Sequence, residues 1–220
     1  MTKPSESYLR QRYGQLRTSL SELAFNLQEI VRSGVEDIEF VDNATVRVKS
    51  KSSFIAKVLS DAERYSPPFK QVEDVIGARI LVLFPRAAKD VFTRTTSRLF
   101  PPVESGYRQS ADPKVFGYEG FQSICSLPGE LLANYDYGDD FPKVFELQIR
   151  TLFQHASLET EHELFYKHPP KLTPQQEFQY KKRLAWIAAD AWGADRVLGE
   201  LHNILIRSRK KDMTQPSKKA

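Results

Sequence analysis

The sequence has a single cysteine, Cys125, among its 220 residues. A single cysteine excludes an intrachain disulfide and a zinc site built from cysteine ligands. No apolar run approaches the roughly 20 residues that a membrane-spanning helix needs, and the first residues lack the apolar stretch of a signal peptide. Internal repeats and low-complexity stretches are also lacking. We therefore expect a cytoplasmic protein without a membrane partner, in which Cys125 is a small buried core residue.

The sequence also lacks a strong charge of either sign outside its C-terminal end. Its formal net charge is +4, and residues 207–220 alone carry six cations and one anion, which gives +5. Subtracting +5 from +4 leaves the rest of the chain at −1. We expect one domain over residues 1–208 and a basic, disordered tail over 209–220. A solvated tail and an RNA-contacting arm are both compatible with this charge.

Hydrophobic periodicity predicts helices packed on a mixed β-sheet. Apolar residues recur at helical spacing over 5–33, 51–64, 86–99, 151–167 and 173–208. Short apolar or alternating runs predict strands over 39–49, 75–84, 121–127 and 143–149. Two glycine-containing stretches, 101–118 and the acidic 135–140, are expected to be loops. This mixed order of strands and helices is typical of an α+β fold.

Two cations alternate at the end of the first predicted strand. Because alternate residues of a strand point to the same side, Arg47 and Lys49 share a face. Ser53 and Lys57 lie four residues apart in the following helix and also share a face. Three cations and a hydroxyl at a strand-to-helix transition suit a triphosphate, to which the helix N-terminus adds backbone donors. An ordinary solvated surface explains the lysines as well.

Carboxylates accompany two of the other predicted strands. Glu146, Gln148 and Arg150 share one face of the last strand, opposite its apolar residues. Asp74 stands at the start of the apolar strand 75–84, where an acid can hold Mg²⁺, a cation that prefers carboxylate, water and phosphate oxygens. A surface or capping aspartate explains Asp74 equally well. Together with the cationic strand, these residues predict one polar cleft for a polyphosphate and its metal.

Two further patterns carry aromatic and imidazole groups. Tyr118 follows Gly117 in a glycine-containing segment, so its ring can stand free of secondary structure and stack on a base. A buried loop tyrosine is the alternative. His155, Glu159 and His162 fall on one helical face, and we interpret this stripe as pairing along a helix surface in preference to a metal site.

Taken in this order, the segments resemble the synthetase domain of the RelA/SpoT family, the nucleotide pyrophosphokinases that make alarmones. The resemblance covers about residues 40–167 and rests on four groups of matched residues: Arg47, Lys49, Ser53 and Lys57; Asp74, Gly77 and Arg79; Glu146 to Thr151; and Glu161, His162, Tyr166 and Lys167. It implies a nucleotidyltransferase-like fold with terminal helices, as in the small single-domain members. It also implies synthesis without hydrolysis, because the hydrolase domain of long members is lacking.

The resemblance implies a reaction and the residues for it. The β,γ-pyrophosphate of ATP would pass to the 3′-hydroxyl of GDP or GTP with Mg²⁺ as cofactor. Asp74 and Glu146 would be metal ligands and catalytic residues, and Glu146 is the candidate base for the acceptor hydroxyl. The residues implied to bind ATP are Arg47, Lys49, Ser53, Lys57 and Arg79. The residues implied to bind the acceptor are Tyr118, Gln148, Arg150 and His162.

The chain departs from the family pattern on the acceptor side. Glu119 stands where a basic residue is usual, Gln122 where a histidine is usual, and Ser157 where many members carry tryptophan. Toxin-type members that pyrophosphorylate the tRNA 3′ end or adenosine nucleotides are therefore an alternative. An inactive module that binds nucleotide or RNA is another. A homo-oligomeric state and binding to an antitoxin partner are also compatible with the sequence.

Overall fold

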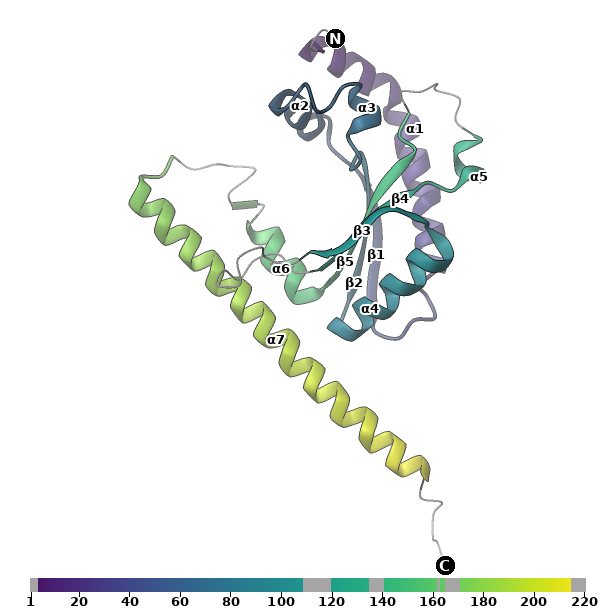
Figure 1. The fold of residues 1–220 in the computed structure, drawn as a ribbon, viewed down its shortest axis with the longest axis vertical. Coiled ribbons are helices and arrows are strands. Elements are labelled where there is room, and N and C mark those ends of the chain that lie inside the picture. Colours follow the sequence, from purple (N-terminus) through teal and green to yellow (C-terminus); the bar gives the residue numbers. More distant parts are fainter. Residues whose placement is uncertain (1–3, 109–119, 135–140, 162, 165–170, 215–220) are drawn as a thin grey trace, which may run out of the picture.

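The structure, a computed structural model, describes residues 4–108, 120–134, 141–161, 163–164 and 171–214. Its strands are β1 (Val41–Val48), β2 (Ile76–Val82), β3 (Pro102–Arg108), β4 (Gly120–Ser126) and β5 (Val144–Thr151). Its helices are α1 (Glu6–Ser33), α2 (Lys51–Ser60), α3 (Pro68–Gln71), α4 (Pro85–Arg94), α5 (Gly129–Leu132), α6 (Leu152–Glu161) and α7 (Pro174–Thr214). A π-helical turn, Thr95–Leu99, extends α4. Figure 1 shows their arrangement.

The five strands form one mixed sheet in the order β1-β2-β5-β4-β3. β2 and β5 run parallel, whereas the other three neighbouring pairs are antiparallel. α1 and α4 lie on one side of the sheet and α6 on the other (Figure 1). This architecture confirms the predicted α+β fold, and it makes β5, the strand that carries Glu146, the central strand.

One face of the sheet is apolar and forms the core beneath α1 and α4. Alternate side chains of β2 and β5 are buried in it, namely Ile76, Ala78, Ile80 and Val82, and Phe145, Leu147 and Ile149. Helix α1 contributes one continuous stripe, Leu9, Leu16, Leu20, Leu23 and Leu27. Cys125 is buried among these residues, and burial raises the pKa of its thiol to about 12. Its predicted place in the core is confirmed.

Aromatic side chains fix the junction between β1 and α2. The ring centroid of Phe54 on α2 lies 5.4 Å from that of Tyr13 on α1 and 4.6 Å from that of Phe69 on α3. The hydroxyl of Tyr13 donates a hydrogen bond to the backbone carbonyl of Lys49. Helix α1 therefore supports the strand-to-helix transition that was predicted to bind a triphosphate.

Several elements differ in extent from their prediction. The expected loop over 101–118 is wrong for residues 102–108, which form β3 because they pair antiparallel with β4. Helix α2 ends at Ser60 instead of 64, and α7 ends at Thr214 instead of 208. The predicted loop 135–140 and tail residues 215–220 lie outside the described residues, as do most of those predicted to extend α6 beyond Glu161.

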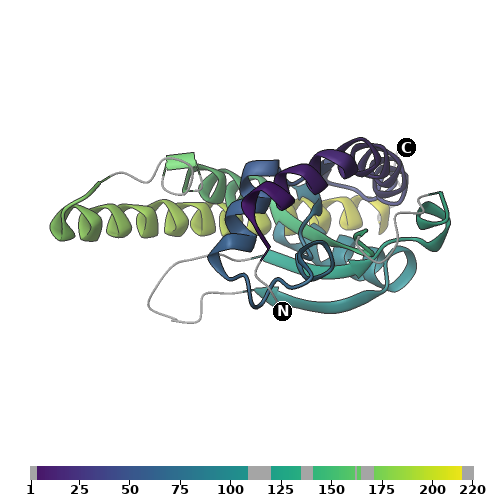
Figure 2. The same cartoon turned by 90° about the horizontal axis from the view of Figure 1, so that it is seen from above.

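Helix α7 passes along one side of the domain and projects beyond it (Figures 1 and 2). Its buried residues attach it to the domain at two points. Asp195 accepts a hydrogen bond of 2.7 Å from Thr151 Oγ1, and the ring of His202 lies 4.6 Å from those of Phe40 and Phe84. Large apolar side chains elsewhere on the helix are exposed, including Trp186, Val197, Leu201 and Ile204. Within the described ranges, no helix is long and apolar enough to cross a membrane.

Candidate active site

The polar face of the sheet brings together residues from four strands. The register pairs Arg47 of β1 with Gly77 of β2, and Gly77 in turn with Glu146 of β5. In the next row Arg79 pairs with Gln148, and Gln148 with Gln122 of β4. Directly paired residues project from the same face of a sheet. The cationic strand and the carboxylate strand therefore contribute to one surface.

Gly77 leaves a gap in the row between Arg47 and Glu146. A Cβ atom at this position would meet no atom within 4 Å. The packing of the sheet itself therefore does not require glycine here. A side chain at this position would instead project between the guanidinium-bearing strand and the carboxylate-bearing strand, into the space in front of the polar face.

Asp74 lies at the start of β2 between two lysines. Lys49 Nζ is 2.8 Å from Asp74 Oδ2, and Lys57 Nζ is 3.0 Å from Oδ1. Burial by itself raises the pKa of Asp74, but the hydrogen bond and charge of Lys49 and the charge of Lys57 outweigh it, so the pKa lies below its usual value. Asp74 is thus ionised at neutral pH. It holds both half-buried lysines beside the N-terminus of α2.

Helix α2 begins next to this ion-paired group. Ser50 caps the helix, because its Oγ accepts a hydrogen bond of 3.1 Å from the backbone N–H of Ser53. The Ser50 hydroxyl also donates to Ser53 Oγ at 2.8 Å. Ser53 is exposed in the first helical turn, where backbone N–H groups and the helix dipole favour an anion.

Arg79 contacts the carboxylate of Glu159, and Arg150 and Arg47 lie close enough to Arg79 to act on its charge. Arg79 Nη1 lies 3.2 Å from Glu159 Oε2 and 3.3 Å from His155 Nδ1. Burial, followed by the charges of Arg150 and Arg47, lowers the pKa of Arg79. Arg150 is only 7% exposed. Together, these arginines and Glu159 carry an excess of positive charge on a partly dry surface, which is typical of a site for phosphate groups.

The stripe on α6 has a role that sequence reasoning missed. His155 Nδ1 lies 3.8 Å from Glu159 Oε2, so the predicted pairing along the helix is present. Both side chains, however, also contact Arg79 of β2. Their helical spacing was the available signal, because it predicted a common face. The sequence did not show that this face points toward the sheet, because its direction is set by the packing of α6.

The titration of His155 follows from this packing. Burial, followed by the charge of Arg79, lowers the pKa of His155 from 6.5. We expect an NMR titration midpoint below that value. The neutral ring is then the form that the fold favours, so the contribution of His155 to stability is complete above the unfolded pKa and is lost as the pH falls through the folded pKa.

Substitution of Arg79 tests the assignment. Arg79→Met should move the His155 midpoint upward, because it removes a nearby cation and leaves Glu159 to favour the imidazolium. The exposed Arg10→Met variant on α1 is the control and should leave the midpoint in place. A midpoint that does not respond to Arg79→Met would show that these two side chains are apart in solution.

Glu146 lies between two amides on the polar face. Gln148 Nε2 donates a hydrogen bond of 2.6 Å to Glu146 Oε2, and Gln122 Nε2 donates to Oε1. Sequence reasoning treated Gln122 only as a departure from the family pattern. Its contact with Glu146 depends on the register of β4 against β5, which local periodicity does not reveal.

Comparison with known proteins adds to this geometry. The model of the region found in RelA/SpoT proteins matches residues 46–171, more than half of the chain. The chain belongs to the RelA/SpoT family. The predicted family membership is thus confirmed. A comparison with curated proteins gives no match.

Solved structures share the fold of this RelA/SpoT chain. A GTP pyrophosphokinase family protein from Streptococcus pneumoniae has 21% identity and a TM-score of 0.68, over 94% of this chain and 97% of the other. Small alarmone synthetase 1 from Bacillus subtilis, bound to its product pppGpp, has 23% identity and a TM-score of 0.66, over 88% and 97%. The Type VI effector Tas1, in complex with its immunity protein, has 12% identity and a TM-score of 0.51, over 84% and 97%.

Thr151, the last residue of the matched RelA/SpoT strand motif, has a structural role. Its Oγ1 accepts a hydrogen bond of 3.1 Å from Gln154 N, and Gln154 Oε1 accepts one of 3.0 Å from Thr151 N. This reciprocal pair is a capping box that begins α6 directly after β5. The same hydroxyl donates to Asp195 of α7. Thr151 therefore fixes two helices to the end of the central strand.

Two predicted acceptor-binding residues of the RelA/SpoT pattern, Tyr118 and His162, lie outside the described residues. Within the part of the chain that the structure describes, no group of three or more His, Cys, Asp or Glu side chains gathers as a metal centre. Asp74 contacts Lys49, Glu146 contacts Gln148, and Glu159 contacts Arg79. That Asp74 and Glu146 bind a metal ion stays a prediction.

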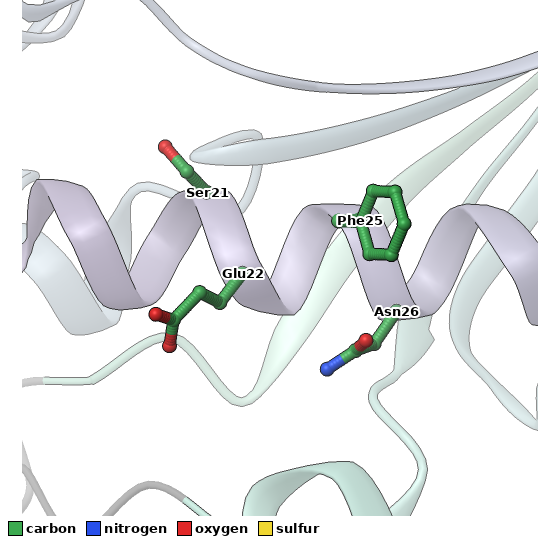
Figure 3. Close-up of a pocket in the computed structure, with 4 residues that line it drawn as sticks. All are labelled: Ser21, Glu22, Phe25 and Asn26. Atoms are coloured by element: carbon green, nitrogen blue, oxygen red, sulfur yellow. The ribbon is translucent and has the colours of Figure 1, made fainter.

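A shallow hollow elsewhere on the surface is separate from this site. It lies on α1 and is lined by Ser21, Glu22, Phe25 and Asn26 (Figure 3). Because α1 covers the apolar face of the sheet, the core separates this hollow from the polar face that carries Glu146. We assign the hollow no part in the chemistry.

Proposed function

We propose that the chain is a nucleotide pyrophosphokinase that transfers the β,γ-pyrophosphate of ATP to the 3′-hydroxyl of GDP or GTP. The observation that supports this most directly is the row in which Arg47 and Glu146 flank Gly77. Arg47, a cation that suits a triphosphate, and Glu146, a carboxylate that can accept a hydroxyl proton, thereby lie on either side of one open space. The product pppGpp bound to the Bacillus subtilis relative supports a guanine nucleotide as acceptor.

The proposed chemistry assigns each group a task. The 3′-oxygen of the acceptor attacks the β-phosphorus of ATP, the bond from that phosphorus to the oxygen of the AMP portion breaks, and AMP leaves. The hydroxyl proton passes to the carboxylate of Glu146. Such a transfer depends on positioning and charge neutralisation more than on covalent catalysis. Arg47, Arg79, Lys49 and Lys57 supply the neutralising charge.

Asp74 and Glu146 carry the carboxylate oxygens that a magnesium ion prefers as ligands. Mg²⁺ is commonly held by one or two carboxylates together with waters and substrate phosphates, so Asp74 and Glu146 are a sufficient protein contribution. The cation would neutralise charge on the phosphates. Asp74 now holds Lys49 and Lys57, and a triphosphate offers those lysines other anionic partners. This exchange would release the Asp74 oxygens for the cation.

The function is tested by identifying the acceptor. The purified chain would be incubated with γ-labelled ATP, Mg²⁺ and, separately, GDP, GTP, AMP, ATP and deacylated tRNA. We expect a labelled product with GDP or GTP. No product with any acceptor would instead support an inactive binding module.

The toxin-type alternative rests on the altered acceptor side. Gln122, which replaces the usual histidine, contacts the candidate base Glu146 directly. An effector that forms a complex with an immunity protein shares the fold, so an inhibitory partner is compatible with this architecture. Product from tRNA or an adenine nucleotide, with none from GDP or GTP, would replace our proposal with this one.

ATP binding can be separated from acceptor binding. Arg47→Ala and Lys57→Ala should each weaken ATP binding by roughly 1–3 kcal/mol, the size of a charge-assisted contact. Acceptor binding alone should hardly change in titration calorimetry. Arg10→Ala, which alters an exposed pair on α1, is the control and should leave both affinities in place. Equal losses for ATP and acceptor would contradict the assignment of these cations to ATP.

A further inference from the structure

The carboxylate of Glu146 is held at both of its oxygens by neutral donors. Gln122 reaches Oε1 from β4, and Gln148 reaches Oε2 from two residues along β5. The backbone explains this arrangement, because Gln122 and Gln148 are direct partners in the β4–β5 register and Glu146 is the next residue on the same face. The two amides therefore approach the carboxylate from the same row.

A carboxylate bound at both oxygens has little freedom to rotate. Its two oxygens together offer about four acceptor positions, so two amide donors leave positions for a hydroxyl or a cation. A group whose rotamer is fixed in advance loses less entropy when the reacting geometry forms. Each amide is also neutral, so the two hydrogen bonds orient the Glu146 carboxylate without neutralising its charge.

The residue type at position 122 matters because it decides which donor reaches Glu146. The family usually has a histidine here, whose ring nitrogen can also donate a hydrogen bond. Glutamine donates the same kind of hydrogen bond from a neutral amide.

We propose that Gln122 is a positioning residue which, together with Gln148, holds the Glu146 carboxylate in the orientation that accepts the acceptor's proton. This inference rests on the proposed function. It extends that function to a residue at which the chain departs from its family.

The first test uses Gln122→Met, which keeps the length of the side chain and removes the donor. We expect kcat to fall by roughly 10- to 100-fold, the usual cost of losing a group that orients a reacting ligand, with KM for ATP within about twofold of the original. Gln175→Met, at an exposed position near the start of α7, is the matched control and should retain full turnover. A Gln122→Met variant with normal kcat would overturn the proposal.

A second readout distinguishes positioning from a merely structural role. Gln122→His keeps an N–H donor at this position, so it should recover part of the kcat that Gln122→Met loses. A histidine variant as slow as Gln122→Met would contradict the contact.

A third measurement does not depend on activity. Gln122→Met should lower the melting temperature more in the original chain than in a Glu146→Met background, where no acceptor for the Gln122 amide is present at position 146. Equal losses in both backgrounds would overturn the contact even if the chain transfers no pyrophosphate. Absence of product from the original chain with every acceptor would overturn the proposed function and leave this thermal cycle interpretable.

Discussion

Replacement of Glu146 by glutamine should lower the rate of pyrophosphate transfer at least about a hundredfold, while ATP binding stays measurable. The amide cannot accept the hydroxyl proton, and it is a weaker ligand for Mg²⁺. It also places a donor between Gln122 and Gln148, which are themselves donors to this position. Single-turnover rates with saturating ATP and acceptor would measure the loss.

The control for this variant is Glu22→Gln on the outer surface of α1. Glu22 is exposed, and α1 packs on the opposite side of the sheet, so turnover should be unchanged. Thermal unfolding of both variants would exclude a general loss of folded protein. A Glu146→Gln enzyme with near-normal turnover and a normal Mg²⁺ requirement would rule out Glu146 as both base and metal ligand.

Enlargement of Gly77 should abolish transfer without unfolding the chain. A Cβ at this position meets no atom within 4 Å, and β-branched residues suit a strand, so Gly77→Val should leave stability unchanged or raise it by about 0.5–1 kcal/mol. The added methyl groups would project between Arg47 and Glu146. A displacement of about 1 Å in the reacting groups can cost about a hundredfold in rate.

The loss should be graded with size, so that Gly77→Ala retains more activity than Gly77→Val. Gly129→Val is the matched control, because its Cβ also meets open space but lies at the start of α5, away from the polar face. Rates and melting temperatures of the three variants would be compared. A Gly77→Val enzyme that is as active as the original would show that substrate does not occupy this gap.

The alternation within single strands was enough to predict much of this site. Because Phe145, Leu147 and Ile149 are apolar, Glu146, Gln148 and Arg150 had to share the other face, and the register places that face opposite the core. The same reasoning predicted one surface for Arg47 and Glu146. These predictions held because burial of one face fixes the orientation of every residue in a strand.

Contacts between distant segments could not be predicted in this way. β3 was missed because its proline and glycine are unfavourable in strands, and only pairing with β4 explains it. The sequence predicted that Lys49 and Lys57 belong to one cationic group at a strand-to-helix transition. It did not predict their common partner, Asp74, which lies at the start of another strand. The contacts of Gln122 with Glu146 and of His155 with Arg79 likewise depend on tertiary packing.

The hydroxyl of Thr151 links the long C-terminal helix to β5, the strand that carries Glu146. Thr151 follows Arg150 directly in the sequence. Its hydroxyl caps α6 and donates a hydrogen bond to Asp195 of α7. A partner that pulls α7 away from the domain would separate the buried carboxylate of Asp195 from its donor, Thr151. Loss of this hydrogen bond costs free energy and would also disturb the end of β5, where Thr151 lies. Such linkage is reciprocal. Under the proposed function, a nucleotide bound at Arg150 would therefore make α7 harder to displace, and a protein that binds α7 would weaken nucleotide binding.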